Sequence, residues 1–128
     1  MARLVLPISE GVLPLEMVDD VVIVHAGVEL MTDLVNPEQF GRELLALVEP
    51  FGCRRIIVNL KALHVVTSAV MGKMITMHRT MQRHQGVLIF CNLQEAVENV
   101  LRTSRLNTYL QIALDVRSSL AALQKSTV

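Results

Sequence analysis

The sequence predicts an open-sheet α/β fold, in which a mixed β-sheet begins with an antiparallel hairpin and carries about four helices. Short runs of β-branched and apolar residues alternate along the chain with segments of helical periodicity. The connections are short, so the strands after the hairpin are expected to run parallel through right-handed crossovers. With 128 residues, the chain is expected to form a single domain over residues 1–128, because one core commonly holds about 100 to 200 residues.

The opening hairpin is predicted from two β-branched runs, Val12–Val18 and Val21–Ala26. Between them stand only Asp19 and Asp20. Aspartate is favoured in tight turns because its short side chain bonds nearby backbone groups and tolerates left-handed backbone angles. Two strands joined by so short a turn pair antiparallel.

A loop and the first helix are predicted to follow the hairpin. Gly27–Val35 has no clear period and contains Asp33, which is typical of an irregular connection. Asn36 can cap a helix and Pro37 suits its first position, while Pro50 ends it. The apolar side of this helix is expected to carry Phe40, Leu44, Leu47 and Val48.

The middle of the sheet is predicted from Cys53–Leu60. Its continuous apolar run Ile56–Val58 is typical of a strand that is covered on both faces. A second helix is expected from about Ser68 to His84, with Gly86 as its stop signal. One side of this helix carries Val70, Met71, Met74, Ile75, His78 and Met81.

Methionines recur along this second helix at Met71, Met74, Met77 and Met81. Such a stripe is more often part of a core than of an interface. Because four methionines exceed what one buried face accommodates, Met71 or Met77 is the alternative candidate for an adaptable, exposed contact.

The remaining elements are predicted from shorter signals. Val87–Cys91 is expected to form another buried strand. Asn92 with Glu95 offers a capping box for a third helix. Leu110–Ala113 is expected to form the last strand, and Asp115 to cap the final helix.

Charge and hydropathy exclude several classes of protein. Acidic and basic residues balance at 12 each, so no long-range field draws in nucleic acid or an anionic membrane surface. The apolar stretch near the N-terminus is broken by Pro7, Ser9 and Glu10, which leaves it too short for an export signal. Other apolar runs fall far below the roughly 20 residues that a membrane-spanning helix needs. We therefore expect a cytoplasmic protein without membrane insertion.

The residues that usually build catalytic or metal sites show no supporting pattern. Cys53 and Cys91 lack metal-ligand spacing and are expected to be buried, reduced thiols. No glycine-rich phosphate cradle follows a strand, so no cofactor is expected. The histidines are His25, His64, His78 and His84. They are scattered, and no metal ligand set, catalytic residue or enzymatic activity is predicted.

The most distinctive residues follow the central strand. Ligands and partners of open α/β sheets usually meet the carboxyl ends of the strands, which singles out Lys61–Ser68. There, Thr67–Gly72 reads Thr-Ser-Ala-Val-Met-Gly and opens the second helix. This stretch resembles the signature of the STAS family of anti-sigma factor antagonists, whose pattern is Asp-Ser-Ser-Gly-Leu-Gly. The element order and the Gly27–Asn36 loop are also similar, so the resemblance covers nearly the whole chain and implies a STAS-like fold.

The resemblance implies a protein-binding regulatory module. The best-known members of the family are switched when an anti-sigma factor that is also a serine kinase phosphorylates the first serine of the motif. By position this serine is Ser68, with Thr67 as the alternative. Independently, a helix N-terminus is a place where unpaired amides and the helix dipole favour negative charge. A phosphate would add about −1.5 to −2 charges there, enough to disrupt a neutral interface.

Three positions depart from the family pattern and leave two alternatives open. Thr67 replaces the aspartate, Ala69 the second serine and Val70 the first glycine. One alternative is a STAS scaffold, or a subunit of a signalling or transport complex, in which Thr67 or Ser68 only caps the helix. The other is a small-ligand-binding domain with a cavity lined by His64 and Ser68.

The resemblance and the place of the motif together predict a surface that binds an anti-sigma factor or serine protein kinase. This surface comprises His64, Thr67, Ser68, Ala69, Met71, Gly72 and Asp33. For His64, a loop histidine without a role is the alternative. Whether the chain forms a homo-oligomer is left open by the sequence.

Overall fold

The computed structural model describes residues 2–4, 15–25, 48, 52–63 and 66–125 of the chain. Its strands are β1 (Ala2–Leu4), β2 (Leu15–Val18), β3 (Val21–His25), β4 (Arg55–Asn59), β5 (Val87–Cys91) and β6 (Ile112–Ala113). Its helices are α2 (Ser68–Arg83), α3 (Glu95–Thr103), α4 (Leu106–Tyr109) and α5 (Val116–Lys125). The short helix α4 was not predicted from the sequence.

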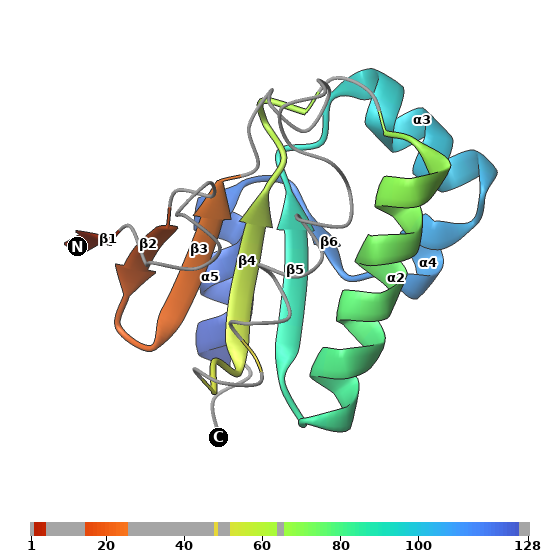
Figure 1. Cartoon of the computed structure of the whole chain (residues 1–128). Coiled ribbons are helices and arrows are strands. Elements are labelled where there is room, and N and C mark those ends of the chain that lie inside the picture. The colour runs from red at the N-terminus through yellow and green to blue at the C-terminus, as the bar shows by residue number, and fades with distance from the viewer. Residues whose placement is uncertain (1, 5–14, 26–47, 49–51, 64–65, 126–128) are drawn as a thin grey trace.

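The strands form one mixed sheet in the order β1-β2-β3-β4-β5-β6 (Figure 1). The pairs β1–β2 and β2–β3 are antiparallel. The pairs β3–β4, β4–β5 and β5–β6 are parallel. The predicted mixed α/β sheet with an opening hairpin is therefore confirmed.

The hairpin turns at the two aspartates that the sequence indicated. Val18 pairs with Val21, so only Asp19 and Asp20 connect the strands. Asp19 has a φ of 56°, a left-handed angle that aspartate tolerates better than most residues. Asp20 also accepts a hydrogen bond from the guanidinium of Arg55 across 3.4 Å, which joins the turn to the start of β4.

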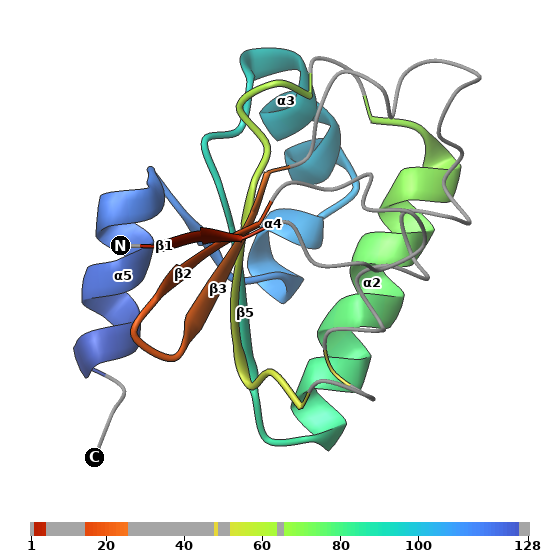
Figure 2. The ribbon, with the colours of Figure 1, turned by 60° about the vertical axis from the view of Figure 1, so that its left-hand side comes forward.

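Helices cover both faces of the sheet, with α2, α3 and α4 on one side and α5 on the other (Figure 2). Because side chains alternate along a strand, Ile56 and Val58 enter the core under α2, whereas Ile57 enters the smaller core under α5. All three are 0% exposed. The predicted central strand, buried on both faces, is confirmed.

The predicted first helix and the loop before it fall almost entirely outside the described residues. Val48 is the described residue of that helix, and it is helical and buried. The final helix begins as expected, because the carboxylate of Asp115 accepts a hydrogen bond from the backbone N–H of Ser118 across 2.7 Å. This bond lowers the pKa of Asp115.

The end of α2 differs from the sequence prediction in its cause. Gln85, not Gly86, adopts the left-handed angle, with a φ of 60°. The N–H groups of Gln85 and Gly86 donate to the carbonyls of Gln82 and Met81 across 3.0 and 2.7 Å, which closes the helix end. Gly86 is needed for another reason, since a Cβ atom there would lie 2.8 Å from the carbonyl oxygen of Arg54.

Replacing Gly86 with alanine is therefore expected to lower the free energy of unfolding by about 1 to 3 kcal/mol, because the new methyl group overpacks against backbone. Gly72 is the matched control. It lies inside α2, and outside the helix's own backbone no atom of the described residues lies within 4 Å of where an alanine methyl group would be. Gly72→Ala should therefore raise stability by about 0.5 to 1 kcal/mol through helix propensity. Urea unfolding followed by circular dichroism measures both, and equal effects of the two variants would contradict this account.

Candidate functional site

The start of α2 is positioned by Thr67. This residue has an extended backbone, with φ −92° and ψ 166°, and its hydroxyl accepts a hydrogen bond from the N–H of Val70 at 3.2 Å. Its carbonyl accepts the first helical bond, from Met71 at 2.9 Å. Thr67 is thus the helix cap, a role for which threonine is well suited.

Ser68 is the first residue of the helix and differs from Thr67 in the state of its hydroxyl. Thr67, Ser68 and Ala69 are all exposed. Among the described residues, the Ser68 hydroxyl makes no hydrogen bond, whereas the Thr67 hydroxyl is engaged in capping. Val70, only 2% exposed, fixes this first turn onto the core. The exposed turn therefore displays an unengaged hydroxyl on a firmly packed base.

The methionines of α2 separate into buried residues and one partly exposed residue. Met74, Met77 and Met81 are at most 1% exposed, so the alternative of an exposed contact at Met77 is wrong. All three belong to the hydrophobic core that α2 shares with the sheet. Met71 is half-buried, and its sulfur lies 3.9 Å from the Ser104 hydroxyl at the end of α3.

The loop that leads from β4 towards α2 is held from two sides. The N–H of Lys61 donates to Oδ1 of Asn59 across 3.0 Å. Nε2 of Gln94, which precedes α3, donates to the Lys61 carbonyl across 2.5 Å. Leu60 and Leu63 on either side of this point are buried. The described first half of the loop is therefore a fixed structure.

Asn59 connects the carboxyl ends of three neighbouring segments. Its Nδ2 lies 3.1 Å from Nδ1 of His25, at the end of β3. Its Oδ1 accepts a second bond, from Nδ2 of Asn92 just after β5, across 3.1 Å. With the amide in this orientation, Nδ1 of His25 is an acceptor and its Nε2 is left to donate to Glu16, whose Oε1 lies 2.5 Å away.

Asn92 corrects a prediction from the sequence. It does not cap the third helix, because α3 begins at Glu95 with Gln94 as the cap residue and no side-chain cap bond. Asn92 instead has a left-handed φ of 56°, which asparagine tolerates, and its side chain turns back to Asn59. Neither asparagine was predicted as part of the site, although a polar residue at the end of β4 and another directly after β5 were a usable signal.

The other candidate residues are distributed as follows. His64 and Asp33 lie outside the described residues, and Gly72 is exposed. His78 packs its ring edge-on against Tyr109, with centroids 4.7 Å apart, and burial lowers its pKa. Of the predicted docking surface, the structure thus brings together the residues around the start of α2.

The two cysteines are predicted from the sequence to be buried, reduced thiols. Both cysteines are free, with Cys91 buried and Cys53 half-buried, and burial raises the pKa of each thiol. In the part of the chain that the structure describes, no three His, Cys, Asp or Glu side chains gather as a metal site would require. No helix within those residues is long and apolar enough to cross a membrane.

Chemically, the start of α2 displays a hydroxyl, and the residues that the structure describes around it supply no base that would activate it. No described histidine or carboxylate is hydrogen-bonded to Ser68, and a serine nucleophile needs such a base. The first turn also contains no acidic residue. Within this turn, an incoming negative charge would therefore meet the free N–H groups of the helix start and no acidic side chain.

Solved structures with the same fold include regulatory proteins. A serine-to-glutamate variant of RsbS from Moorella thermoacetica has a TM-score of 0.76 and 22% identity, over 90% of this chain and 97% of that one. A chain from the stressosome, a signal integration and transduction hub, has a TM-score of 0.72 and 24% identity, over 88% and 97%. The Bacillus cell fate determinant SpoIIAA, in its phosphorylated form, has a TM-score of 0.63 and 18% identity, over 87% and 98%.

Sequence comparison assigns the family directly. No curated protein matches the chain. The family model of the STAS domain, however, matches residues 13–119, which include the hairpin, the central strand, the start of α2 and most of the elements after it. Together with the fold of the solved structures, this match shows that the chain belongs to the STAS domain family.

Proposed function

We propose that this chain is a protein-binding regulatory module of the anti-sigma-factor-antagonist type, which docks through the start of α2 and is switched by phosphorylation of Ser68. The observation that carries the proposal is the exposed hydroxyl of Ser68, which no described residue engages, at the first position of a well-anchored helix. The expected partner is an anti-sigma factor that is also a serine kinase. Binding, not catalysis, is the proposed activity, and its expected place is the cytoplasm.

The chemistry of the surface supports docking that is sensitive to charge. Thr67, Ser68, Ala69 and Gly72 are exposed, small and uncharged, so a partner can approach the helix start closely. Phosphorylation would add about −1.5 to −2 charges at the centre of this surface. The free amides of the helix start would accommodate that charge, so the domain would stay folded while its contact surface changed.

Of the two hydroxyls, that of Thr67 is the less suitable acceptor of a phosphoryl group. Its oxygen already accepts a hydrogen bond from the Val70 N–H, and its modification would disturb the cap.

The proposed step transfers the terminal phosphoryl group of ATP to Oγ of Ser68. The serine O–H bond and the bond between the β-γ bridging oxygen and the γ-phosphorus break, the serine O–P bond forms, and ADP and a proton leave.

This assignment predicts a single phosphate on Ser68. The purified chain would be incubated with ATP and extract of the cells that express it, then digested and sequenced by mass spectrometry. The expected result is a phosphate on the peptide that contains Ser68, which is lost in Ser68→Ala and retained in Thr67→Val. Phosphate that persists in Ser68→Ala would contradict the assignment.

A non-phosphorylated STAS scaffold is the second candidate, favoured by Thr67 in the place of the family aspartate. Its hydroxyl makes a cap bond to Val70 and carries no charge. The chain from the stressosome, a signal integration and transduction hub, has the same fold, which supports this candidate. A scaffold would gain no phosphate in the same extract, yet would still capture a partner through the start of α2.

A further inference from the structure

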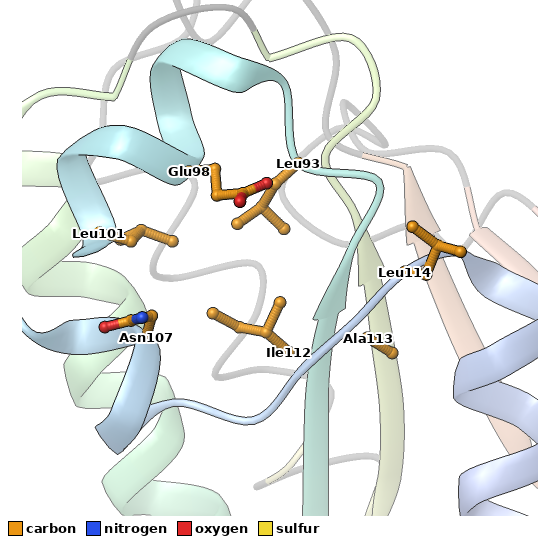
Figure 3. A pocket seen from close by; sticks show the side chains of 7 residues that line it. All are labelled: Leu93, Glu98, Leu101, Asn107, Ile112, Ala113 and Leu114. Carbon is orange, nitrogen blue, oxygen red and sulfur yellow. The ribbon is translucent and has the colours of Figure 1, made fainter.

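A pocket on the other side of the molecule from the hairpin lies between α3, α4 and β6 (Figure 3). Its volume is about 370 Å³, which falls within the range of roughly 300 to 1,000 Å³ typical of small-molecule sites. Apolar walls come from Leu93, Leu101 and Ile112. Ser68 does not line it, so this pocket is separate from the proposed docking surface.

The rim of the pocket carries an unusual apolar side chain. Leu114 is 80% exposed and is the most exposed large hydrophobic residue in the part of the chain that the structure describes. It follows β6 directly, and its carbonyl accepts a hydrogen bond from the N–H of Asn92 at 3.1 Å, so its backbone is fixed. Leu114 thus adds exposed apolar surface to the lining of the pocket.

Two polar side chains complete the walls, one from each short helix. Glu98 comes from α3 and Asn107 from α4. Both are exposed, and neither side chain has a hydrogen-bond or ion-pair partner among the described residues. The nearest basic residue along α3, Arg102, bonds instead to Asn99. The pocket therefore combines apolar walls with one carboxylate that no described residue pairs with.

We propose that this pocket binds an alkylammonium group, that is, a primary amine carried by a short aliphatic chain. The aliphatic chain would cover Leu114 and the apolar walls, and the ammonium group would pair with the carboxylate of Glu98. An ammonium group has three donors and no acceptor, and its positive charge suits the carboxylate on the pocket wall. The amine is either a free metabolite or a lysine side chain, and the test separates the two.

The test is a titration of the ¹⁵N-labelled chain with n-hexylammonium chloride, followed by amide chemical shifts. We expect saturable shifts at Leu93, Glu98 and Ile112, and about tenfold weaker binding in Glu98→Gln because a hydrogen bond to a charged group is lost. Glu95→Gln is the matched control. Glu95 and Glu98 both lie in the first turn of α3, so the two variants lose the same favourable interaction with the helix dipole.

Three results would overturn the assignment of the pocket to an alkylammonium group. They are hexanoate binding as strong as that of hexylammonium, equal effects of Glu98→Gln and Glu95→Gln, and the absence of a saturable shift at the pocket. A second arm uses Nα-acetyl-lysine methylamide. Tighter binding of this probe than of hexylammonium identifies a lysine side chain as the ligand, and the reverse order identifies a free amine. Because the docking surface is untouched, these results are independent of the fate of Ser68.

Discussion

Replacing Ser68 with aspartate is expected to weaken partner binding by about 100-fold, while Ser68→Ala keeps it within about threefold. A carboxylate at this position would be forced into the centre of an uncharged interface, and an unpaired buried charge costs roughly 2 to 5 kcal/mol. The free energy of unfolding should not fall, because an acid in the first turn of a helix interacts favourably with the helix dipole. Calorimetric titration with the partner captured by the wild-type chain measures the affinity.

The control for this prediction places the same charge elsewhere on α2. Thr76 is exposed and lies two turns further along the helix, so Thr76→Asp should leave the affinity nearly unchanged. If Ser68→Asp bound as tightly as wild type, docking through the start of α2 would be excluded. If Thr76→Asp weakened partner binding as much as Ser68→Asp, the loss of affinity would result from the added net charge and not from its position on the helix.

Replacing Asn59 with leucine is expected to destabilise the protein by roughly 2 to 4 kcal/mol, because each polar group left unpaired at a partly buried site costs about 1 to 3 kcal/mol. The variant would leave Nδ1 of His25 and the amide of Asn92 without this partner at part-buried positions, and it would remove the acceptor of the exposed Lys61 N–H. It would also release the loop that leads to α2, so partner affinity should fall as well. Urea unfolding gives the first effect, and amide hydrogen exchange at Lys61 gives the second.

Two further variants distinguish the loss of loop positioning by Asn59 from a general loss of protein stability. Asn59→Asp keeps an acceptor for Lys61 and Asn92 and loses only the donor to His25, so it should recover most of the protection at Lys61. Asn99→Leu removes an exposed asparagine from α3 and should change stability by no more than about 0.5 kcal/mol. Unaltered exchange at Lys61 in Asn59→Leu would show that the loop is held by other contacts.

Local signals predicted most of the fold. The aspartate pair of the hairpin, the run Ile56–Val58 and the cap at Asp115 each depend on neighbours in sequence, and all three are confirmed. The predictions that were wrong depended on contacts between segments that are distant in the sequence. Gly86 is small because Arg54 from another segment approaches it. Met77 is buried because α2 buries more of its surface in the core than a single row of helically spaced residues covers.

The candidate site was predictable in part, for a similar reason. The motif at Thr67–Gly72 identifies the helix start from a local pattern, and the structure adds that Thr67 caps while Ser68 is unengaged. The link from Glu16 through His25 and Asn59 to Asn92 depends on the register of neighbouring strands, which is antiparallel between β2 and β3 and parallel from β3 to β5. His25 pairs with Asn59 and Asn59 with Cys91, a relation between distant segments that no spacing along the chain encodes.

The turn at Asp19 and Asp20 lies at the opposite end of the sheet from the start of α2 (Figure 1). Both aspartates are exposed, and lengthening a surface connection costs little, about 0.6 kcal/mol for each doubling. A fluorescent or affinity module could therefore be spliced into this turn without obstructing a partner at α2. The carboxyl end of the sheet has no such freedom, since one amide group there fixes the spacing of three segments.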